Sequence, residues 1–239
     1  MYSLFTADLH LKLTDSEKPY ANFKSFLNSI KGKCDKLYIL GDLFTYWYEH
    51  PEVNFYSKNP ALKAIKEFKK SGAKVYFLIG NRDFAAGKYF QEYSDVDFIG
   101  EDMTIDLPGK KILLTHGDRL AKKDIRYQIW RKFVRSKISS FVFKRLPVGY
   151  AISIADRFKT VGKNNPIAEK TIVDMISDEA VEYFKKDYDI IIAGHAHFKC
   201  YKDYEINGKT RKLYILPEFN FPGQFLTLEN GILEYKQIS

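Results

Sequence analysis

The stretch Leu78-Ile79-Gly80-Asn81-Arg82-Asp83 (residues 78–83) ends the apolar run KVYFLI in side chains that commonly bind metals and phosphates. Four other apolar runs of similar length end in the same way. The segments are Asp8-Leu9-His10 after SLFTA, Gly41-Asp42 after KLYIL, His116-Gly117-Asp118 after KILLT, and Gly194-His195-Ala196-His197 after DIIIA. Runs of about five apolar residues are typical of buried strands, so the sequence predicts five strands with such ends.

Helical patterns separate the first three runs, which predicts parallel strands joined by crossover helices. The patterns cover residues 19–31 and 60–70, and a glycine that favours helix termination follows each of them. Ligands of such sheets gather outside the carboxyl ends of the strands. We therefore expect an α/β fold in which all five segments reach one site.

The other patterns complete a single domain over residues 1–239. Residues 103–115, with Pro108-Gly109 at their centre, predict a β-hairpin that leads to His116. Residues 166–186 predict an amphipathic helix, and the Asn-Gly pairs at 207–208 and 230–231 predict antiparallel hairpins. Residues 44–56 predict an aromatic loop. The two cysteines lack a CxxC spacing, so we expect them to be packing residues.

The net charge of +8 is concentrated in one stretch, which we expect to be an insertion at about residues 122–165. Residues 122–163 contain twelve Lys or Arg and two acids, a net charge of +10, which leaves −2 for the rest of the chain. One basic stretch on a neutral body indicates a localised anionic partner. Its basic, aromatic and aliphatic residues predict either a helix at a membrane surface or a helical hairpin packed on the body with solvated charges.

The sequence also favours a cytosolic location. The first residues lack a basic segment before Asp8. The longest uncharged apolar stretch, LPVGYAISIA at 146–155, is too short to span a bilayer.

Seven side chains in the five segments are candidate metal ligands: Asp8, His10, Asp42, Asn81, His116, His195 and His197. Three oxygen donors and four imidazoles exceed what one tetrahedral ion uses, so we expect two ions. Two-metal hydrolytic sites hold ions about 3.5 to 4 Å apart and acidify a bound water. Asp42, the only acid of its segment, is the expected bridging ligand.

Each of these residues alone has a simpler interpretation. An Asp after a strand is often a helix N-cap, and a His in an apolar setting is usually a hydrogen-bonded core residue. Four of the five histidines nevertheless fall in these segments, which favours a common site. We expect the fifth, His50, to be an ordinary loop residue.

The order DLH, GDLF, GNRD, HGD and GHAH over residues 8–197 resembles the calcineurin-like metallophosphoesterase superfamily. Within it, GDLFTYW, GNRDFAAGKYF and HGDRLAKKDIRYQ resemble the UDP-2,3-diacylglucosamine hydrolase family of lipid A synthesis. The resemblance implies a four-layer α/β/β/α sandwich with a helical cap formed by the basic stretch. It also implies hydrolysis of a diphosphate by a metal-activated hydroxide, giving UMP and lipid X, 2,3-diacylglucosamine 1-phosphate.

The same resemblance implies two divalent ions, most often Mn²⁺, and residue roles. One ion would be held by Asp8, His10, Asp42 and His197, and the other by Asp42, Asn81, His116 and His195. Catalytic roles would fall to Asn81, Arg82 and His116, while Asp83 and Asp118 would orient ligands. Substrate contacts would come from Trp47, Asn81, Arg82, Asp124, Tyr127, Lys159, Lys163, Asn164 and His195.

The implied partners are the UDP-linked lipid and the inner-leaflet membrane surface, reached through the basic cap. Lys132, Arg135, Lys144 and Arg145 are the residues expected to meet that surface. No nucleic acid partner is expected, and the oligomeric state stays open. A metallophosphoesterase acting on another nucleotide diphosphate or phosphodiester is the first alternative. A nucleic-acid-binding module and a non-catalytic membrane-associated protein are two others.

Arg82 favours hydrolysis of a diphosphate over hydrolysis of a phosphodiester. Many members of the superfamily place there a histidine that can protonate an alkoxide leaving group, and arginine cannot act as an acid near neutral pH. Cleavage of a diphosphate expels a phosphate monoester, whose second pKa of about 6 lets it leave unprotonated. We therefore expect Arg82 to bind phosphate oxygens, with a solvated surface arginine as the simpler alternative.

Overall fold

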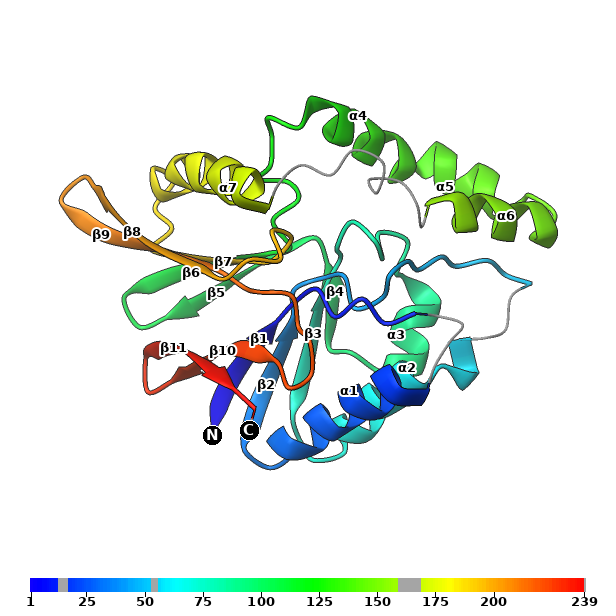
Figure 1. The fold of residues 1–239 in the computed structure, drawn as a ribbon, viewed down its shortest axis with the longest axis horizontal. Coiled ribbons are helices and arrows are strands. Elements are labelled where there is room, and N and C mark those ends of the chain that lie inside the picture. Colours follow the sequence, from blue (N-terminus) through cyan, green and yellow to red (C-terminus); the bar gives the residue numbers. More distant parts are fainter. Residues whose placement is uncertain (13–16, 53–55, 159–168, 239) are drawn as a thin grey trace.

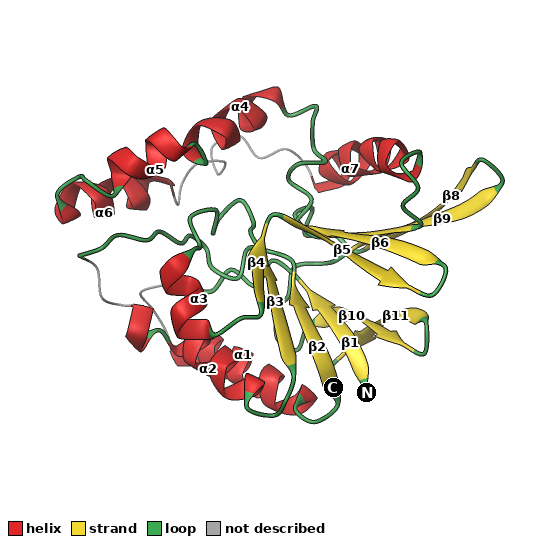
Figure 2. Ribbon diagram, turned by 180° about the vertical axis from the view of Figure 1, so that it is seen from behind, coloured by secondary structure: helices red, strands yellow, loops and turns green. Residues whose placement is uncertain are grey.

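The computed structural model describes residues 1–12, 17–52, 56–158 and 169–238, and it contains two β-sheets that face each other (Figure 1). Helices cover the outer face of each sheet, and the four layers are also visible from behind (Figure 2). The predicted α/β/β/α sandwich is therefore confirmed. Both termini lie at the end of the first sheet that points away from the cap helices (Figure 1).

The first sheet has six strands, in the order β11-β10-β1-β2-β3-β4. Its strands are β1 (Tyr2–Thr6), β2 (Cys34–Ile39), β3 (Lys74–Leu78), β4 (Phe98–Gly100), β10 (Gln224–Glu229) and β11 (Ile232–Gln237). Strands β1 to β4 are parallel, as predicted, and β10 is antiparallel to β1. Its outer face is covered by α1 (Glu17–Ile30), α2 (Pro60–Lys69) and α3 (Lys88–Ser94), and a short turn of helix, η1 (Tyr56–Lys58), precedes α2.

The second sheet has five strands, in the order β5-β6-β7-β9-β8. They are β5 (Asp102–Leu107), β6 (Lys110–Thr115), β7 (Ile190–Ala193), β8 (Cys200–Ile206) and β9 (Lys209–Ile215), and α7 (Glu169–Phe184) covers them. All three predicted hairpins are present. The Asn and Gly of both Asn-Gly turns have positive φ, which is the backbone of a tight two-residue hairpin.

The apolar side chains form three layers that match this arrangement. One cluster packs α1 and α2 on the first sheet, for example Phe26 and Ile65. A second fills the space between the sheets, where Phe5 stacks on Tyr38. A third packs α7 on the second sheet through residues such as Ile176. The two sheets are held together by this middle layer, by the loops at their ends, and by the Tyr235 hydroxyl of β11, which lies 2.9 Å from the Cys200 and the Ile215 carbonyl of the second sheet.

The basic insertion forms three helices, α4 (Ile125–Val134), α5 (Lys137–Phe143) and α6 (Val148–Phe158), rather than the helical hairpin that was one expectation. They lie across the carboxyl ends of the strands, apart from both sheets (Figure 1). Several of their large apolar side chains are exposed, including Ile129 and Phe141. The insertion is therefore a cap over the predicted site.

Candidate metal centre and the cavity under the cap

The five predicted segments meet at one place, between the carboxyl ends of the two sheets. Hydrogen bonds join their backbones: the Asp8 N–H donates to the Gly41 carbonyl at 3.1 Å, and the Gly194 N–H to the His116 carbonyl at 2.8 Å. The His195 N–H donates to Asp8 Oδ2 at 2.9 Å. The expectation of a common site for all five segments is confirmed, although two sheets rather than one supply it.

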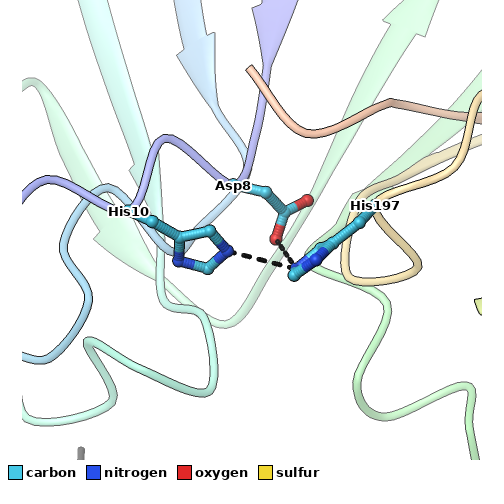
Figure 3. Close-up of side chains that lie close together, drawn as sticks. All are labelled: Asp8, His10 and His197. Atoms are coloured by element: carbon cyan, nitrogen blue, oxygen red, sulfur yellow. Dashed lines mark hydrogen bonds and ion pairs between the residues drawn. The ribbon is translucent and has the colours of Figure 1, made fainter. Parts of the chain in front are cut away.

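Asp8, His10 and His197 form one group of candidate ligands (Figure 3). The His10 and His197 Nε2 atoms are 3.1 Å apart, and His197 Nε2 lies 3.4 Å from Asp8 Oδ1. All the ligand atoms of this group lie within 4.8 Å of one another. Side chains from both sheets thus face a single point.

Asp8, Asp42 and His116 form a second group. Asp42 faces both sides, because its Oδ2 lies 3.9 Å from His10 Nδ1 and its Oδ1 lies 3.7 Å from His116 Nε2. Asp8 belongs to both groups as well. Asp42 therefore has the position expected of a bridging ligand, and Asp8 is a second shared carboxylate.

Asn81 joins His116 of the second group to His195, the fourth histidine of the cluster. Its Oδ1 lies 2.9 Å from His116 Nε2 and 2.9 Å from His195 Nδ1. His116 Nδ1 is 2.8 Å from the Leu40 carbonyl oxygen, which can only accept a hydrogen bond. The proton of a neutral His116 therefore sits on Nδ1, and Nε2 is left as a metal ligand.

The donors of this cluster fit divalent cations. Asp8 Oδ1 is buried and has no hydrogen-bond partner within the described part of the chain. The His197 ring lies 3.4 Å from this oxygen, so a cation bound between them would satisfy a buried carboxylate oxygen that now makes no hydrogen bond. Two carboxylates beside several imidazoles are also a donor set that suits transition-metal ions.

The protonation states of the cluster also favour the binding of divalent cations. Burial lowers the pKa of His10 to about 4 and that of His195 to about 3, so both rings are neutral and able to bind metal. Burial alone would lower the pKa of His197, but the Asp8 carboxylate raises it to about 9. Burial raises the pKa of Asp42 to about 6, against the attraction of His116. A metal ion arriving here would displace the proton of His197.

The backbone at the cluster is strained. Five of the seven candidate ligands have positive φ, between 50° and 70°: Asp8, His10, Asp42, His195 and His197. Non-glycine residues rarely adopt this conformation, and it occurs most often at functional sites. The residue types of the ligands do not predict these positive φ angles. The glycines beside the ligands are the one feature of the sequence that indicates an unusual backbone there.

Two of those glycines allow the loops to approach closely. A Cβ on Gly194 would lie 2.7 Å from Ala7 Cβ and 2.8 Å from Asp8 Oδ2. A Cβ on Gly80 would overlap Asp42 Oδ1 and the Asp42 backbone nitrogen. Both positions therefore require glycine for steric reasons.

Asp83 holds two of the loops together, as expected of a residue that orients ligands. Its Oδ1 accepts the Gly80 N–H at 2.8 Å and the Asp42 N–H at 3.2 Å, and its Oδ2 accepts the Leu43 N–H at 2.8 Å. Asp83 is fully buried. It thereby fixes the Asp42 segment against the Asn81 segment.

Arg82 is half-buried at the edge of this centre. Its N–H donates to Asp42 Oδ1 at 2.8 Å, and its carbonyl accepts the Trp47 N–H at 3.0 Å. Its side chain lines the cavity under the cap. The position is that of a cavity residue beside the candidate ligands rather than a solvated surface arginine.

A cavity of about 900 Å³ extends from the cluster to the underside of the cap. Asp42, Asn81, His195 and His197 line one end. The lining that the cap and α7 contribute is mostly apolar and includes Phe133, Ile138, Val142, Phe143, Ile172 and Met175. It also contains the charged residues Asp124, Arg135, Lys144 and Glu169. The cavity therefore has a polar, metal-binding end and a mostly apolar end.

The predicted substrate contacts fall into two groups. Trp47, Asp124 and Tyr127 line the cavity, although each also supports the structure. Trp47 stacks on Phe44 in the core, and Asp124 caps α4 by accepting the Tyr127 N–H at 3.0 Å. Lys159, Lys163 and Asn164 lie outside the described residues.

Two residues of the aromatic loop were not singled out as functional by the sequence. Glu49 is buried, and its Oε1 accepts the N–H groups of Gly87 and Phe90, each at 2.8 Å. It thereby caps α3, whose own N-cap Gly87 has no side chain to do so. That glycine is the only sequence signal for the role of Glu49.

His50 is not the ordinary loop residue that we expected. It is buried, its Nδ1 accepts the Glu52 N–H at 3.3 Å, and its Nε2 lies 3.1 Å from the Leu146 carbonyl. Since Nδ1 accepts, Nε2–H donates to Leu146. His50 therefore ties the aromatic loop to the cap between α5 and α6.

Within the described residues, none of the helices is both long enough and apolar enough to cross a membrane. This agrees with the reading of the apolar stretch at 146–155.

Comparison with known proteins gives matches along nearly the whole chain. Residues 1–199 match the family model of the calcineurin-like phosphoesterases. The chain is 34% identical over 221 residues to a UDP-2,3-diacylglucosamine hydrolase of Psychromonas ingrahamii, covering 90% of this chain and 88% of that one. It is 32% identical over 230 residues to a Yersinia pestis protein of the same name, covering 95% and 94%. A solved archaeal phosphodiesterase aligns with a TM-score of 0.46 and 14% identity over 100% and 99% of the two chains.

Proposed function

The chain belongs to the calcineurin-like phosphoesterase family, and on this premise we propose that it hydrolyses the diphosphate of UDP-2,3-diacylglucosamine. The products are UMP and 2,3-diacylglucosamine 1-phosphate, an intermediate of lipid A synthesis. One observation carries the proposal: the cavity joins a cluster of metal ligands to a mostly apolar space under the cap. A substrate with a charged diphosphate and two acyl chains needs both ends.

The direct test is release of UMP from UDP-2,3-diacylglucosamine by the purified full-length chain with Mn²⁺. UDP-glucosamine without acyl chains is the matched substrate, and we expect much slower release from it. Equal rates on both would favour the alternative of a general nucleotide diphosphate hydrolase. Metal-independent, salt-sensitive oligonucleotide binding without UMP release would favour the nucleic-acid-binding alternative.

In the proposed site, Asp8, His10, Asp42 and His197 hold one divalent ion. Asp42, Asn81, His116 and His195 hold the other, and Mn²⁺ is the expected metal. When bound, two divalent ions lower the pKa of a water ligand and offset the charge of the diphosphate. The chain's own contribution is to hold these ligands rigidly, through Asp83 and the Leu40 carbonyl.

The residues around the ions orient the diphosphate and its leaving group. The Arg82 guanidinium, beside Asp42, binds phosphate oxygens with its planar set of donors. No general acid is required, because the departing phosphate monoester is stable as an anion. Trp47 and Tyr127 line the wall of the same cavity, where they would contact the substrate.

We expect Arg82→Ala to lower kcat on the diphosphate by roughly one to two decades, since a charge-assisted contact contributes about 1.5 to 3 kcal/mol. Metal content should stay close to that of the wild type, because the backbone N–H of residue 82 still donates to Asp42. Steady-state kinetics and metal analysis of the same sample measure both quantities. Arg126→Ala, at an exposed arginine of α4, is the control, and unchanged kinetics in Arg82→Ala would mean that Arg82 contacts no phosphate.

The outer face of the cap supports the proposal that the enzyme works at an anionic membrane surface. Ile125, Ile129, Phe141 and Tyr150 are exposed and lie outside the cavity lining. The exposed basic residues of the cap outside the cavity lining include Arg126, Lys132, Lys137 and Arg145, whereas Lys144 is exposed but lines the cavity. Arg135, which the sequence had placed in this set, is 10% exposed and points inward instead. Basic and apolar groups on one exposed face suit binding at a lipid interface.

Neutralising Arg126, Lys132, Lys137 and Arg145 together, as glutamines, should weaken binding to anionic vesicles steeply. Each contributes about 1 kcal/mol near such a surface, and salt screens the effect. Turnover of detergent-solubilised substrate should change little. The matched control neutralises Lys31, Lys33, Lys36 and Lys110, four exposed lysines at the opposite ends of the strands. Equal losses of vesicle binding in both variants would mean that net charge, and not the cap, carries the interaction.

A further inference from the structure

Helix α4 of the cap is bound to the loop that carries His116. Asp118, in that loop, is 2% exposed, and its Oδ2 accepts three hydrogen bonds from the helix. The donors are Tyr127 Oη at 2.7 Å, Arg131 Nε at 2.9 Å and an Arg135 guanidinium nitrogen at 3.2 Å. These residues are four apart, so they form one stripe along the helix. The stripe, and not a solvated basic face, explains two of the arginines in the insertion.

Arg135 reaches further than the other two donors. The same guanidinium nitrogen that contacts Asp118 donates to the Gly80 carbonyl at 2.9 Å, and the other donates to Glu101 Oε1 at 2.8 Å. Gly80 directly precedes Asn81, whose amide oxygen contacts His116 and His195. One side chain of the cap therefore joins the loop of Asn81 to the loop of His116.

The surroundings of Arg135 make this junction rigid. The side chains of Arg131 and Arg135 are only 12% and 10% exposed. Burial alone would raise the pKa of Asp118, but Arg135 and His116 hold it well below its usual range, so the carboxylate is ionised. A second contact between the same parts is the edge-to-face packing of Trp130 on Phe84, with centroids 5.8 Å apart. Helix α4 is thus seated on the metal-site loops by buried charge as well as by aromatic packing.

We propose that Arg135 is a positioning residue of the reaction, which fixes the Asn81 loop against the His116 loop through the Gly80 carbonyl and Asp118. A lysine cannot reproduce this arrangement, because its ammonium group is a single point charge rather than a planar fork. Seating of α4 and the geometry of the ligands Asn81, His116 and His195 are therefore coupled. An arginine that merely anchored the cap would affect lipid binding alone.

The test uses the full chain with Arg135→Met, Arg135→Lys and the control Arg126→Met. Titration of the metal-stripped proteins with Mn²⁺ alone measures affinity by calorimetry. We expect Arg135→Met to weaken one of the two Mn²⁺ sites roughly tenfold or more, the usual effect of losing a residue that orients ligands. Arg135→Lys should recover part of the loss, and Arg126→Met should match the wild type.

Kinetics provides the second readout and depends on the proposed function, whereas the Mn²⁺ titration does not. We expect Arg135→Met to lower kcat by the same factor on the lipid and on a small chromogenic phosphodiester, with the KM for the lipid nearly unchanged. Wild-type Mn²⁺ affinities combined with a raised KM for the lipid alone would overturn the inference. If Arg135→Met does not fold, Arg135→Lys decides: wild-type affinity and kcat in that variant would equally overturn it.

If the wild type releases no UMP, the proposed function fails while the Mn²⁺ titrations still decide the role of Arg135. Glu101→Gln adds a further comparison, since Glu101 binds Arg135 at the half-exposed end of the junction. Its contact with the His116 loop is an ion pair with Arg119 at 3.5 Å, and not a contact with a candidate metal ligand. We expect its Mn²⁺ affinities to stay near wild type. If Glu101→Gln lost as much Mn²⁺ affinity as Arg135→Met, the loss in both variants would come from a less stable cap. That result would contradict positioning through Gly80.

Discussion

Asp42→Ala is expected to lose both metal ions and to lower turnover by about a thousandfold or more. Asp42 faces His10 with one oxygen and His116 with the other, so its removal takes a ligand from each proposed ion. Lost stabilisation of about 4 kcal/mol in the transition state corresponds to that factor in rate. Metal content of the purified variant and its kcat on the diphosphate are the measurements.

Loss of metal in Asp42→Ala can be distinguished from loss of fold. The buried Asp42 carboxylate has a pKa raised to about 6 by burial, so its charged form is disfavoured there in the absence of metal. The metal-free variant should therefore melt no lower than the metal-free wild type. Asp106→Ala, at an exposed aspartate of β5, serves as the control. Wild-type metal content and activity in Asp42→Ala would remove Asp42 from the site.

Gly80→Ala is expected to damage the centre without changing any ligand. The new Cβ would overlap the Asp42 carboxylate and its backbone nitrogen, and the backbone cannot swing aside as a flexible side chain could. Overpacking of this kind costs about 1 to 3 kcal/mol of stability. A displacement of about 1 Å in the ligands would lower the rate by roughly a hundredfold. Thermal unfolding and kcat, measured with and without Mn²⁺, test both effects.

Gly149→Ala is the matched control for this substitution. Gly149 lies in helix α6, and a Cβ there would meet no atom within 4 Å. Alanine is favoured over glycine in a helix, so the control should be neutral or slightly stabilising. Loss of activity in the control as well would indicate that the cap, rather than contact with Asp42, is sensitive to glycine replacement.

Local patterns were enough to predict most of the fold. Apolar runs marked five strands, and Pro108-Gly109 and the two Asn-Gly pairs marked three hairpins, because strand length and turn conformation are set by neighbouring residues. The convergence of the metal ligands followed from the rule that such ligands lie at the carboxyl ends of strands. The division into two sheets came only from the resemblance to known proteins.

What could not be predicted depends on partners remote in the sequence. The sequence shows that residues 122–163 are basic, but it does not show which way the side chains point. Arg131 and Arg135 point toward the body because Asp118 and Glu101 accept their hydrogen bonds there. The capping of α3 by Glu49 spans 38 residues, and the bond from His50 to Leu146 spans 96. The positive φ angles of the ligands likewise arise from the assembled loops, since no residue type requires them.

The placement of the ligands on two sheets gives the metals a mechanical role. Asp8, His10, Asp42 and Asn81 follow strands of the first sheet, whereas His116, His195 and His197 follow strands of the second. On the proposed assignment, each ion takes ligands from both sheets. Each ion is then a cross-link between the two halves, added to the apolar layer and to hydrogen bonds such as that from the His195 N–H to Asp8. Binding to the folded state alone raises its stability with ligand concentration. After chelation, we therefore expect the amide hydrogens of the two sheets to exchange at independent rates. With metal bound, the two sheets should unfold, and exchange, as one cooperative unit.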